Sequence, residues 1–470
     1  MHRFDAVSHR IMNIYFVSLG CDKNLVDTEK MLGALTSHGY SFTGDVEAAD
    51  IAVVNTCCFI KDAQTESVQA ILEMADRKKS GLLKGLIVAG CLAQRYRDDI
   101  EKEVPEVDVV LGTTAIDRIV EAADDILRKQ GHEILTESLD KPATGGEARV
   151  LTTGGHYGYL RIAEGCNKWC TYCVIPSVRG PYRSVPMEQV LAEAKELAER
   201  GVKELILVAQ ETTLYGTDLY GEKRLPALLR GLAAIDGIRW IRLLYCYPEE
   251  ITDELIDTIA AEPKVLHYLD MPIQHASDDV LRRMGRHTTR KDLEEVIGKI
   301  RAKIPDCCLR TTLITGFPGE TETDHRHLLA FVRKMKFDRL GVFPYSREDG
   351  TPAAKMKPQI KAAVKRQRRK ELMLAQQEIA FRKARKQKNR ILDAIVEGRI
   401  AEDQVMDVSR PGAFVYTART YMDAPDVDGM LFLETSRDLM TGDFVSVRIT
   451  GSRGYDLIGE LVDTRDNGEA

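Results

Sequence analysis

Long hydrophobic runs are missing from this sequence of 470 residues. No stretch approaches the ~18 apolar residues that a membrane-spanning helix needs. Residues 1–10 carry charges and histidines in place of the apolar core of a secretory signal. We therefore expect a cytoplasmic protein with no membrane partner. The composition, 44% hydrophobic and 29% charged, is that of a globular protein, and the length allows about three domains.

Cysteine is too sparse for a disulfide scaffold, because the whole chain holds only 10. Without an export signal, clustered cysteines bind metal more often than they form disulfides. An excess of positive charge is also missing, since the net charge of −6 gives no general attraction to nucleic acid. The placement of the few cysteines therefore carries more information about function than the composition does.

The densest group of cysteines is Cys166-Asn-Lys-Trp-Cys170-Thr-Tyr-Cys173. A 4Fe–4S cluster normally takes four thiolates, so three in one loop leave one iron open to bind and reduce a small molecule. Gly165 and Tyr172 fit a loop folded tightly around a cofactor. A structural zinc site is the alternative, but zinc takes four ligands and no fourth Cys or His lies nearby. The pattern resembles the signature of radical S-adenosylmethionine (SAM) enzymes.

Residues 12–128 alternate short apolar runs with helical patterns. This alternation predicts a parallel sheet covered on both faces, in a doubly wound α/β domain of flavodoxin type. The expected strands are Ile14–Leu19, Ile51–Asn55, Leu86–Ala89 and Val107–Leu111, and the expected helices are Asn24–His38 and Lys61–Ala75.

Three further cysteines, Cys21, Cys57 and Cys91, each lie just past the carboxyl end of one of these expected strands. Ligand sites of open α/β sheets form at that edge, so the three thiols should converge and again offer three ligands. Position alone does not separate this hypothesis from three buried cysteines that act as small hydrophobic residues. Cys58 competes with Cys57, because neighbouring residues of an extended chain point in opposite directions.

Several motifs resemble the methylthiotransferase branch of the radical SAM enzymes, from about residue 12 to residue 459. They are Ser18–Asp27, Asn55-Thr56-Cys57, Gly90-Cys91 and Glu164-Gly165-Cys166-Asn167. In that family three N-terminal cysteines bind a second 4Fe–4S cluster. The resemblance therefore implies that two sets of three cysteines are metal ligands, namely Cys21, Cys57 and Cys91, and Cys166, Cys170 and Cys173.

Residues 129–151 are rich in Gly, Glu, Thr and Lys without periodicity and are expected to form a linker. Residues 152–384 then repeat strand and helix, which predicts a partial TIM-like (βα)6 barrel with its function on the loops after the strands. The expected strands are Tyr157–Ala163, Glu204–Ala209, Trp240–Tyr245, Leu266–Met271, Leu309–Ile314 and Arg339–Tyr345, and the expected helices include Met187–Arg200, Leu225–Ala234, Asp253–Ala261, Lys291–Ala302 and Glu322–Met335.

The resemblance implies that the loops after these strands line a SAM pocket. A turn or a helix cap is nearly as good an interpretation of any one of these residues. His275 is expected to form loop hydrogen bonds rather than to catalyse, and Cys246, Cys307 and Cys308 lack partner spacing and are interpreted as structural. The residues that we expect to contact SAM are Tyr172, Gln210, Glu211, Gln274, Arg310 and Gly316.

Gln359–Arg390 has one long helical pattern, with 12 Lys or Arg against 2 Glu between Lys361 and Arg390. We favour a solvated helix that packs on the barrel, and a basic face for rRNA or tRNA is the alternative. Residues 386–455 change to short strands separated by glycines, which predicts a small OB-like barrel and resembles the TRAM domain. Its expected strands are Ile391–Val396, Val405–Val408, Met430–Leu433, Phe444–Thr450 and Tyr455–Leu461.

The charge of this last region bears on its partner. From Arg390 to Ala470 there are 8 basic and 16 acidic residues, which would repel phosphate and attract a basic protein. Acids such as Asp426 and Asp428 are expected to take part in that attraction. The last barrel is therefore expected to dock a basic ribosomal protein of the small subunit, with contact to rRNA through the basic helix as a further option.

Three stretches resemble the RimO subgroup of methylthiotransferases, namely Lys23–Asp27, Leu244–Pro248 and Arg310–Thr312. That subgroup methylthiolates the β-carbon of an aspartate in ribosomal protein twelve of the small subunit, and the alternative subgroup modifies an adenosine of tRNA. A non-catalytic iron–sulfur electron carrier or an RNA-binding regulator is the alternative from another class. A carrier normally closes each cluster with four cysteines, so two sets of three favour an enzyme.

The resemblance implies two 4Fe–4S clusters and SAM as cofactors, together with an electron donor that the sequence does not identify. The cluster on Cys166, Cys170 and Cys173 would cleave SAM to a 5′-deoxyadenosyl radical that removes a hydrogen from the aspartate. The cluster on the N-terminal set would supply the sulfur unit.

Overall fold

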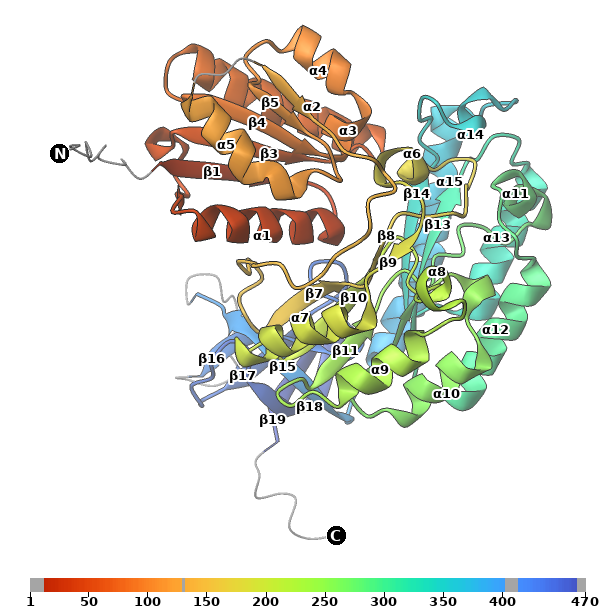
Figure 1. Cartoon of the computed structure of the whole chain (residues 1–470). Helices are drawn as coiled ribbons and strands as arrows, with labels where there is room; N and C mark the ends of the chain where they lie inside the picture. Colours follow the sequence, from red (N-terminus) through yellow and green to blue (C-terminus); the bar gives the residue numbers. More distant parts are fainter. Residues whose placement is uncertain (1–11, 129–131, 402–412, 463–470) are drawn as a thin grey trace, which may run out of the picture.

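The computed structural model describes residues 12–128, 132–401 and 413–462. It holds two six-stranded parallel sheets and a closed barrel of five strands. In Figure 1 the N-terminal sheet with its helices lies at the top, and the C-terminal barrel lies at the lower left of the central unit. Of the helices in these ranges, none is long and apolar enough to cross a membrane.

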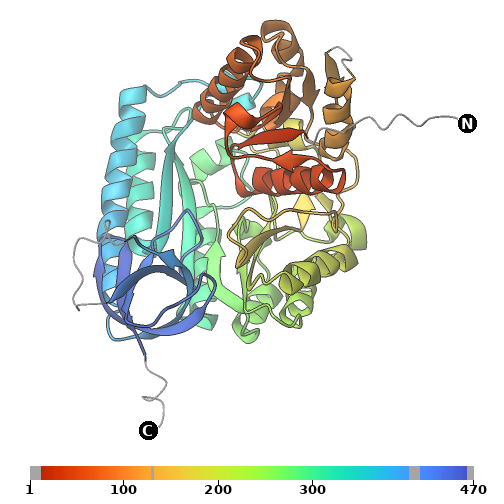
Figure 2. The same cartoon turned by 90° about the vertical axis from the view of Figure 1, so that its left-hand side faces the viewer.

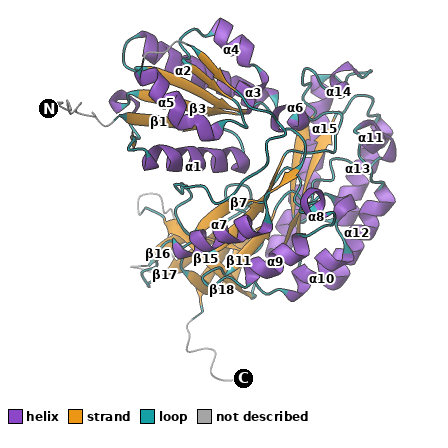
Figure 3. Ribbon diagram, in the orientation of Figure 1, coloured by secondary structure: helices purple, strands orange, loops and turns teal. Residues whose placement is uncertain are grey.

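The N-terminal sheet has the strand order β2-β1-β3-β4-β5-β6, and all its pairs are parallel. Helices cover both of its faces (Figure 3), which confirms the doubly wound α/β prediction. The strands are β1 (Asn13–Ser18), β2 (Ser41–Phe42), β3 (Ile51–Thr56), β4 (Gly85–Gly90), β5 (Val109–Leu111) and β6 (Glu133–Leu135), and the helices are α1 (Asp22–Ser37), α2 (Lys61–Lys79), α3 (Cys91–Arg95), α4 (Arg97–Glu103) and α5 (Ile119–Leu127), with 3-10 turns at Val46–Ala48 and Ile116–Arg118.

The continuous apolar run of β3 explains why both faces are covered. Ala52 and Val54 pack in a cluster with residues of α2, whereas Ile51 and Val53 pack on the opposite side with residues of α1 and α5. Successive side chains of a strand point to opposite faces, so an all-apolar strand must be buried on both.

Two edge strands of this sheet were not predicted. β2 is only two residues long, and β6 pairs with β5 inside the segment that we expected to be a linker. Strands of two or three residues are too short to show a periodic pattern, so only the neighbouring strand defines them.

The central unit is a sheet in the order β14-β13-β12-β11-β10-β7, again with parallel pairs. Its strands are β7 (Tyr157–Arg161), β10 (Glu204–Val208), β11 (Trp240–Leu243), β12 (Val265–Asp270), β13 (Cys308–Thr315) and β14 (Arg339–Pro344), and β8 (Ala163–Glu164) pairs separately with β9 (Arg183–Ser184). Its helices are α6 (Ile175–Arg179), α7 (Met187–Glu199), α8 (Thr217–Tyr220), α9 (Leu225–Ala233), α10 (Asp253–Ala261), α11 (Asp278–Arg283), α12 (Arg290–Lys303), α13 (Glu322–Met335), α14 (Pro352–Lys355) and α15 (Ala362–Arg385), with a 3-10 turn at Pro248–Glu250.

Local signals in the sequence set the boundaries of two of these helices. Thr289 and Thr321 cap α12 and α13, and each forms a capping box with an Asp three residues later. Such a box satisfies two of the backbone N–H groups that a helix start leaves without partners.

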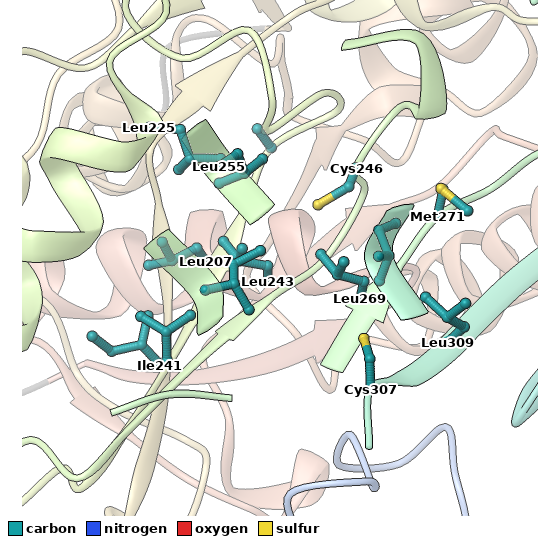
Figure 4. Packing of buried hydrophobic residues seen from close by; sticks show 14 of the residues in the cluster. Leu207, Leu225, Ile241, Leu243, Cys246, Leu255, Leu269, Met271, Cys307 and Leu309 are labelled. Atoms are coloured by element: carbon teal, nitrogen blue, oxygen red, sulfur yellow. The ribbon is translucent and has the colours of Figure 1, made fainter. Parts of the chain in front are cut away.

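Leucines of successive strands form the core between this sheet and its helices, as Figure 4 shows for Leu207, Leu243 and Leu269. Cys246 and Cys307 lie in the same core. Their interpretation as structural residues is therefore confirmed.

The C-terminal unit is a closed barrel in the order β15-β16-β17-β19-β18, seen nearly end-on in Figure 2. A small barrel was predicted, but β16 was missed, and the expected strand Val405–Val408 lies outside the described residues. The strands are β15 (Ile391–Arg399), β16 (Phe414–Thr420), β17 (Leu431–Thr435), β18 (Phe444–Arg453) and β19 (Asp456–Leu461).

Helix α15 packs on the central unit, as the favoured interpretation of the basic stretch required. Leu372 and Ile379 join the central core, and the buried Arg368 forms an ion pair of 2.9 Å with Glu320. Lys383 reaches Asp338 at 2.7 Å. Part of the basic charge of this helix is therefore neutralised by the unit that it covers.

Candidate functional site

Cys21, Cys57 and Cys91 follow three strands that are neighbours in the N-terminal sheet, β1, β3 and β4. Cys21 is the N-cap residue of α1, and Cys91 is the first residue of α3. The backbone of Gly20 lies so close to Cys57 that a Cβ there would come within 3.1 Å of its Sγ, and φ of Gly20 is +100°. The sheet thus brings the loops of these cysteines to one edge.

Asn24, in the first turn of α1, ties these loops together. Its Nδ2 donates to the carbonyl oxygens of Leu19 at 3.0 Å and Thr56 at 2.8 Å, just before Cys21 and Cys57 in the chain. Its Oδ1 accepts a hydrogen bond from the Cys91 thiol at 3.6 Å. One buried side chain therefore contacts all three cysteine loops.

Cys58 points away from this group. Its thiol donates to the carbonyl oxygen of Cys91 at 3.3 Å, and its side chain is fully buried among the apolar residues between β3 and α2. Cys57 instead lies against Gly20, on the side of Cys21. This geometry favours Cys57 over Cys58 as the member of the set.

Arg179 brings a positive charge to the same group. Its Nε donates to the Cys91 Sγ at 3.3 Å. Burial raises the pKa of Cys91, and the guanidinium of Arg179 opposes that shift. A buried cation beside buried thiols is an arrangement suited to holding a negatively charged group.

The second set lies on the loop between β8 and α6, at the carboxyl end of the central sheet. The amide of Cys166 donates to the carbonyl oxygen of Gly180 at 3.1 Å, and the amide of Cys173 donates to that of Cys170 at 3.0 Å. Gly165 has a φ of +78°, and a Cβ there would lie 2.0 Å from the carbonyl oxygen of Pro181. The expected tight loop is therefore present, and its first turn admits only glycine.

Polar atoms without partners surround this loop. Arg286 stacks 4.2 Å above the centre of the Tyr247 ring, and its buried Nε and Nη1 have no hydrogen-bond partner among the described residues. The pKa of Cys166 rises to about 11 because the thiol is buried. Thiolates bound to a metal beside this guanidinium would satisfy both groups. The donor set thus fits a cluster with one open position.

Two amides that were expected to contact SAM also keep a free oxygen. Gln210 donates from Nε2 to Glu164 at 2.6 Å, and Gln274 adopts a φ of +67° after β12. The buried Oε1 atoms of both lack a partner in the described ranges. Buried carbonyl oxygens without partners are costly, so this arrangement suits a bound ligand that donates hydrogen bonds to them.

The other expected contacts lie in more complete environments. Tyr172 makes an edge-to-face contact with Phe317, and Gly316, with a φ of +71°, donates its amide to Glu320 at 2.5 Å. The carboxyl group of Glu211 bonds to Thr213 and is fully buried, which raises its pKa to about 8. These residues shape the loops at the carboxyl end of the sheet.

His275 is a buried hydrogen-bonding residue, as expected. Burial lowers its pKa to about 3, so the ring is neutral at pH 7, and its Nδ1 accepts from the amide of Ser277 at 2.9 Å.

Arg310 lies elsewhere, in a cavity of about 360 Å³ where the three units meet. It forms an ion pair of 2.7 Å with Asp270 and belongs to the same lining as Cys21. The lining residues are Ser18, Leu19, Gly20, Cys21, Asp22 and Leu25 from the N-terminal unit, Tyr159, Leu244, Tyr245, Tyr268, Asp270 and Arg310 from the central unit, and Ala424, Pro425, Asp426 and Val427 from the C-terminal unit.

Tyr245 closes one wall of this cavity in a strained conformation, with a φ of +59°. Its ring lies 3.2 Å from the ammonium of Lys23, and its hydroxyl donates to Asp22 at 3.2 Å. Sequence reasoning did not assign Tyr245, Arg179 or Arg286 to a site, because a lone tyrosine or arginine has no diagnostic spacing.

The expectation that Asp428 faces a partner is wrong. Only 3% of its side chain is exposed, and it accepts hydrogen bonds from the Tyr268 hydroxyl at 2.7 Å and the Ala424 amide at 2.9 Å. Asp426, two residues earlier, lines the three-unit cavity.

Comparison with known proteins shows three family matches along the chain and relatives that cover nearly its full length. Residues 13–112 match an uncharacterized protein family, UPF0004, residues 160–332 match the radical SAM superfamily, and residues 390–462 match the TRAM domain. The chain is 59% identical over 448 residues to the ribosomal protein uS12 methylthiotransferase RimO of Lachnoclostridium phytofermentans, which covers 95% of this chain and 99% of that relative. It is 49% identical over 453 residues to the protein of the same name from Acetivibrio thermocellus, with coverage of 95% and 97%.

The fold also resembles a solved structure, the radical SAM methyltransferase TsrM of Kitasatospora setae. The TM-score is 0.55 at 15% identity, and the match covers 73% of this chain and 75% of TsrM. At this identity the similarity concerns the fold alone.

Proposed function

Since this chain belongs to the RimO family of radical SAM methylthiotransferases, we propose that it methylthiolates the β-carbon of an aspartate in ribosomal protein uS12. It is an enzyme whose cofactors are SAM and 4Fe–4S clusters. The observation that carries the proposal is the pair of cysteine sets, three thiols at the edge of the N-terminal sheet and three on the loop after β8. The reaction takes place in the cytoplasm, where ribosomal proteins are assembled.

The residues that would hold these cofactors are as follows. Cys166, Cys170 and Cys173 would bind one cluster and Cys21, Cys57 and Cys91 the other, each with an open iron. When bound, SAM and the two clusters supply the radical that removes a hydrogen from the aspartate and the sulfur that takes its place.

Residues of the central unit would orient the bound SAM. Arg286 presents two buried nitrogens, and Gln210 and Gln274 each present an amide oxygen, that have no partner in the part of the chain that the structure describes. These donors and acceptors suit the carboxylate, ammonium and hydroxyl groups of SAM. The three units together line the central cavity.

We propose that the segment of uS12 that carries the aspartate binds at this cavity. Its lining holds three carboxylates, and two of them are paired: Asp270 with Arg310 at 2.7 Å and Asp22 with Lys23 at 3.0 Å. Asp426 forms no ion pair among the described residues, so its charge would attract a basic ribosomal protein and repel the phosphates of tRNA. Because Asp426 belongs to the C-terminal barrel, that barrel would contribute to docking directly.

Substitution of Asp426 tests the docking proposal. Its φ is +62°, a conformation that Asn also adopts readily, so Asp426→Asn removes the charge without backbone strain. We expect a higher KM for uS12, a weaker dependence of KM on salt, and unchanged SAM cleavage without uS12. Asp393→Asn is the matched control, because Asp393 is an exposed acid of the same barrel outside the cavity lining. An equal effect of both substitutions would contradict specific docking at the cavity.

Mass spectrometry separates the proposed function from the modification of tRNA. The reconstituted enzyme is incubated with SAM, a chemical reductant and either uS12, assembled small subunits or tRNA. We expect a methylthio mass gain on an aspartate of uS12 and unmodified tRNA nucleosides. The assembled subunit is included because exposed basic residues of α15, such as Arg366, could contact rRNA. Methylthiolated adenosine with unmodified uS12 would overturn the proposal.

A further inference from the structure

Arg179 connects the two cysteine sets across the boundary between the N-terminal and central units. It is the last residue of α6, the short helix that begins two residues after Cys173. Its side chain leaves the central unit and ends among residues of α1 and α3, with only 2% of the residue exposed. A guanidinium that is so fully buried has no access to water, so its N–H groups depend on partners within the protein.

The partners of Arg179 divide into two groups. On one side Nη1 contacts the carboxylates of Asp27 at 2.7 Å and Glu164 at 3.2 Å. On the other side Nε donates to Cys91 Sγ at 3.3 Å and Nη2 donates to Asn24 Oδ1 at 2.5 Å. The same side chain thus holds a cysteine of the N-terminal set and the amide that ties its three loops.

The carboxylates beside Arg179 also have a second arginine as partner. Arg161 also pairs with both Asp27 and Glu164, so two guanidinium groups face two carboxylates. The two carboxylates thus have two guanidinium partners between them, while the Nε–H of Arg179 remains directed at sulfur.

Glu164 connects this network to the cysteine loop of the central unit. It lies two residues before Cys166, and its other oxygen accepts from Gln210 at 2.6 Å. Arg179 is thus linked to the start of one cysteine loop through Glu164 and to the other set through Cys91. A change in the position of either loop would have to move this buried network.

We propose that Arg179 is a positioning residue that fixes Cys91 and raises the reduction potential of the N-terminal cluster. The inference rests on the proposed function, because it assumes that Cys21, Cys57 and Cys91 hold a cluster. Hydrogen bonds to ligand sulfur and nearby positive charge both stabilise the reduced, more negative state of an iron–sulfur cluster. The low dielectric of a buried site strengthens that effect.

The test uses a background that isolates one cluster. In full-length protein with Cys166, Cys170 and Cys173 changed to Ala, the remaining iron reports on the N-terminal set. Two substitutions are added separately: Arg179→Lys, and Arg179→Gln together with Asp27→Asn, which preserves the buried charge balance. Arg183→Gln is the control, because Arg183 lies in the same segment and its hydrogen bonds go to the backbone carbonyl oxygens of Pro181 and Arg179 and not to a cysteine.

The readouts are iron content and the midpoint potential from an EPR-monitored reductive titration. We expect full iron content, a clearly more negative potential in Arg179→Gln/Asp27→Asn, a smaller shift in Arg179→Lys, and no shift in Arg183→Gln. An unchanged potential in an iron-loaded Arg179→Gln/Asp27→Asn protein would overturn the inference. Absence of iron in the background protein itself would instead overturn the assignment of the N-terminal cluster. If only Arg179→Gln/Asp27→Asn lost its iron, the Arg179→Lys potential would decide, and an unshifted value there would also overturn the inference.

Discussion

The attachment of the C-terminal barrel depends on Arg419. This residue of β16 forms ion pairs with Glu204 of β10 at 2.7 Å and with Glu397 of β15 at 2.6 Å. Glu204 is fully buried and also pairs with Arg242 at 2.7 Å. Burial alone would raise the pKa of Glu204, but Arg419 and Arg242 hold it below its usual range. Arg419 and Arg242 together therefore balance the two carboxylates Glu204 and Glu397, and loss of Arg419 leaves one negative charge in excess.

Arg419→Met should destabilise the barrel by about 3–5 kcal/mol, the usual cost of removing one partner of a buried ion pair. Arg419→Met with Glu397→Gln should recover most of that loss, because the buried pair of Glu204 and Arg242 that remains is balanced. In a protein of several units the loss should appear as an earlier separate transition in calorimetry.

Activity assays connect this prediction to function. The barrel carries Asp426, so loosening it should raise the KM for uS12 while SAM cleavage without uS12 persists. A melting profile of Arg419→Met that matches the wild type would refute the reasoning, as would a double variant less stable than the single one.

Three further outcomes are expected. Glu211→Gln should remove a pH dependence of the folding stability. Burial raises the pKa of Glu211 to about 8, so the protonated carboxyl group favours the folded state. The free energy of unfolding of the wild type should therefore fall by about 1.4 kcal/mol per pH unit from about pH 5 to 8. The melting temperatures of the wild type and Glu211→Gln should diverge across that range, and parallel curves would contradict the raised pKa of Glu211. Cys58→Ala should keep its full iron content with a stability loss of about 1 kcal/mol, whereas Cys57→Ala should lose iron; iron assays with the reverse result would reassign the ligand. Cys21→Ala should abolish methylthiolation but retain 5′-deoxyadenosine formation by chromatography, and loss of both in a folded protein would contradict the division of roles.

Strong local patterns made most of the fold predictable. The helices Asp253–Ala261 and Glu322–Met335 have the expected bounds, because polar caps precede their apolar stripes. The long apolar runs of β3 and β4 identified buried parallel strands. The two- and three-residue strands β2 and β6 escaped prediction because their partners, and not their own residues, determine them.

The cysteine sets were visible in the sequence because their spacing and their positions after strands carry information. Arg179 and Arg286 were not, because each acts through contacts that form only when distant segments meet. Asp426 and Asp428 show the same limit within one loop, because Asp426 lines a cavity and the side chain of Asp428 is buried in ion pairs with arginines. Counting charges cannot separate them.

Iron analysis of three reconstituted proteins tests the central claim that two cysteine sets hold two clusters. The wild type should bind about eight irons per chain, and each triple Cys→Ala variant, at Cys21, Cys57 and Cys91 or at Cys166, Cys170 and Cys173, about four. Only the first variant should still cleave SAM. If either triple variant lost all of its iron or none of it, the two sites would not be independent clusters and the account would be contradicted.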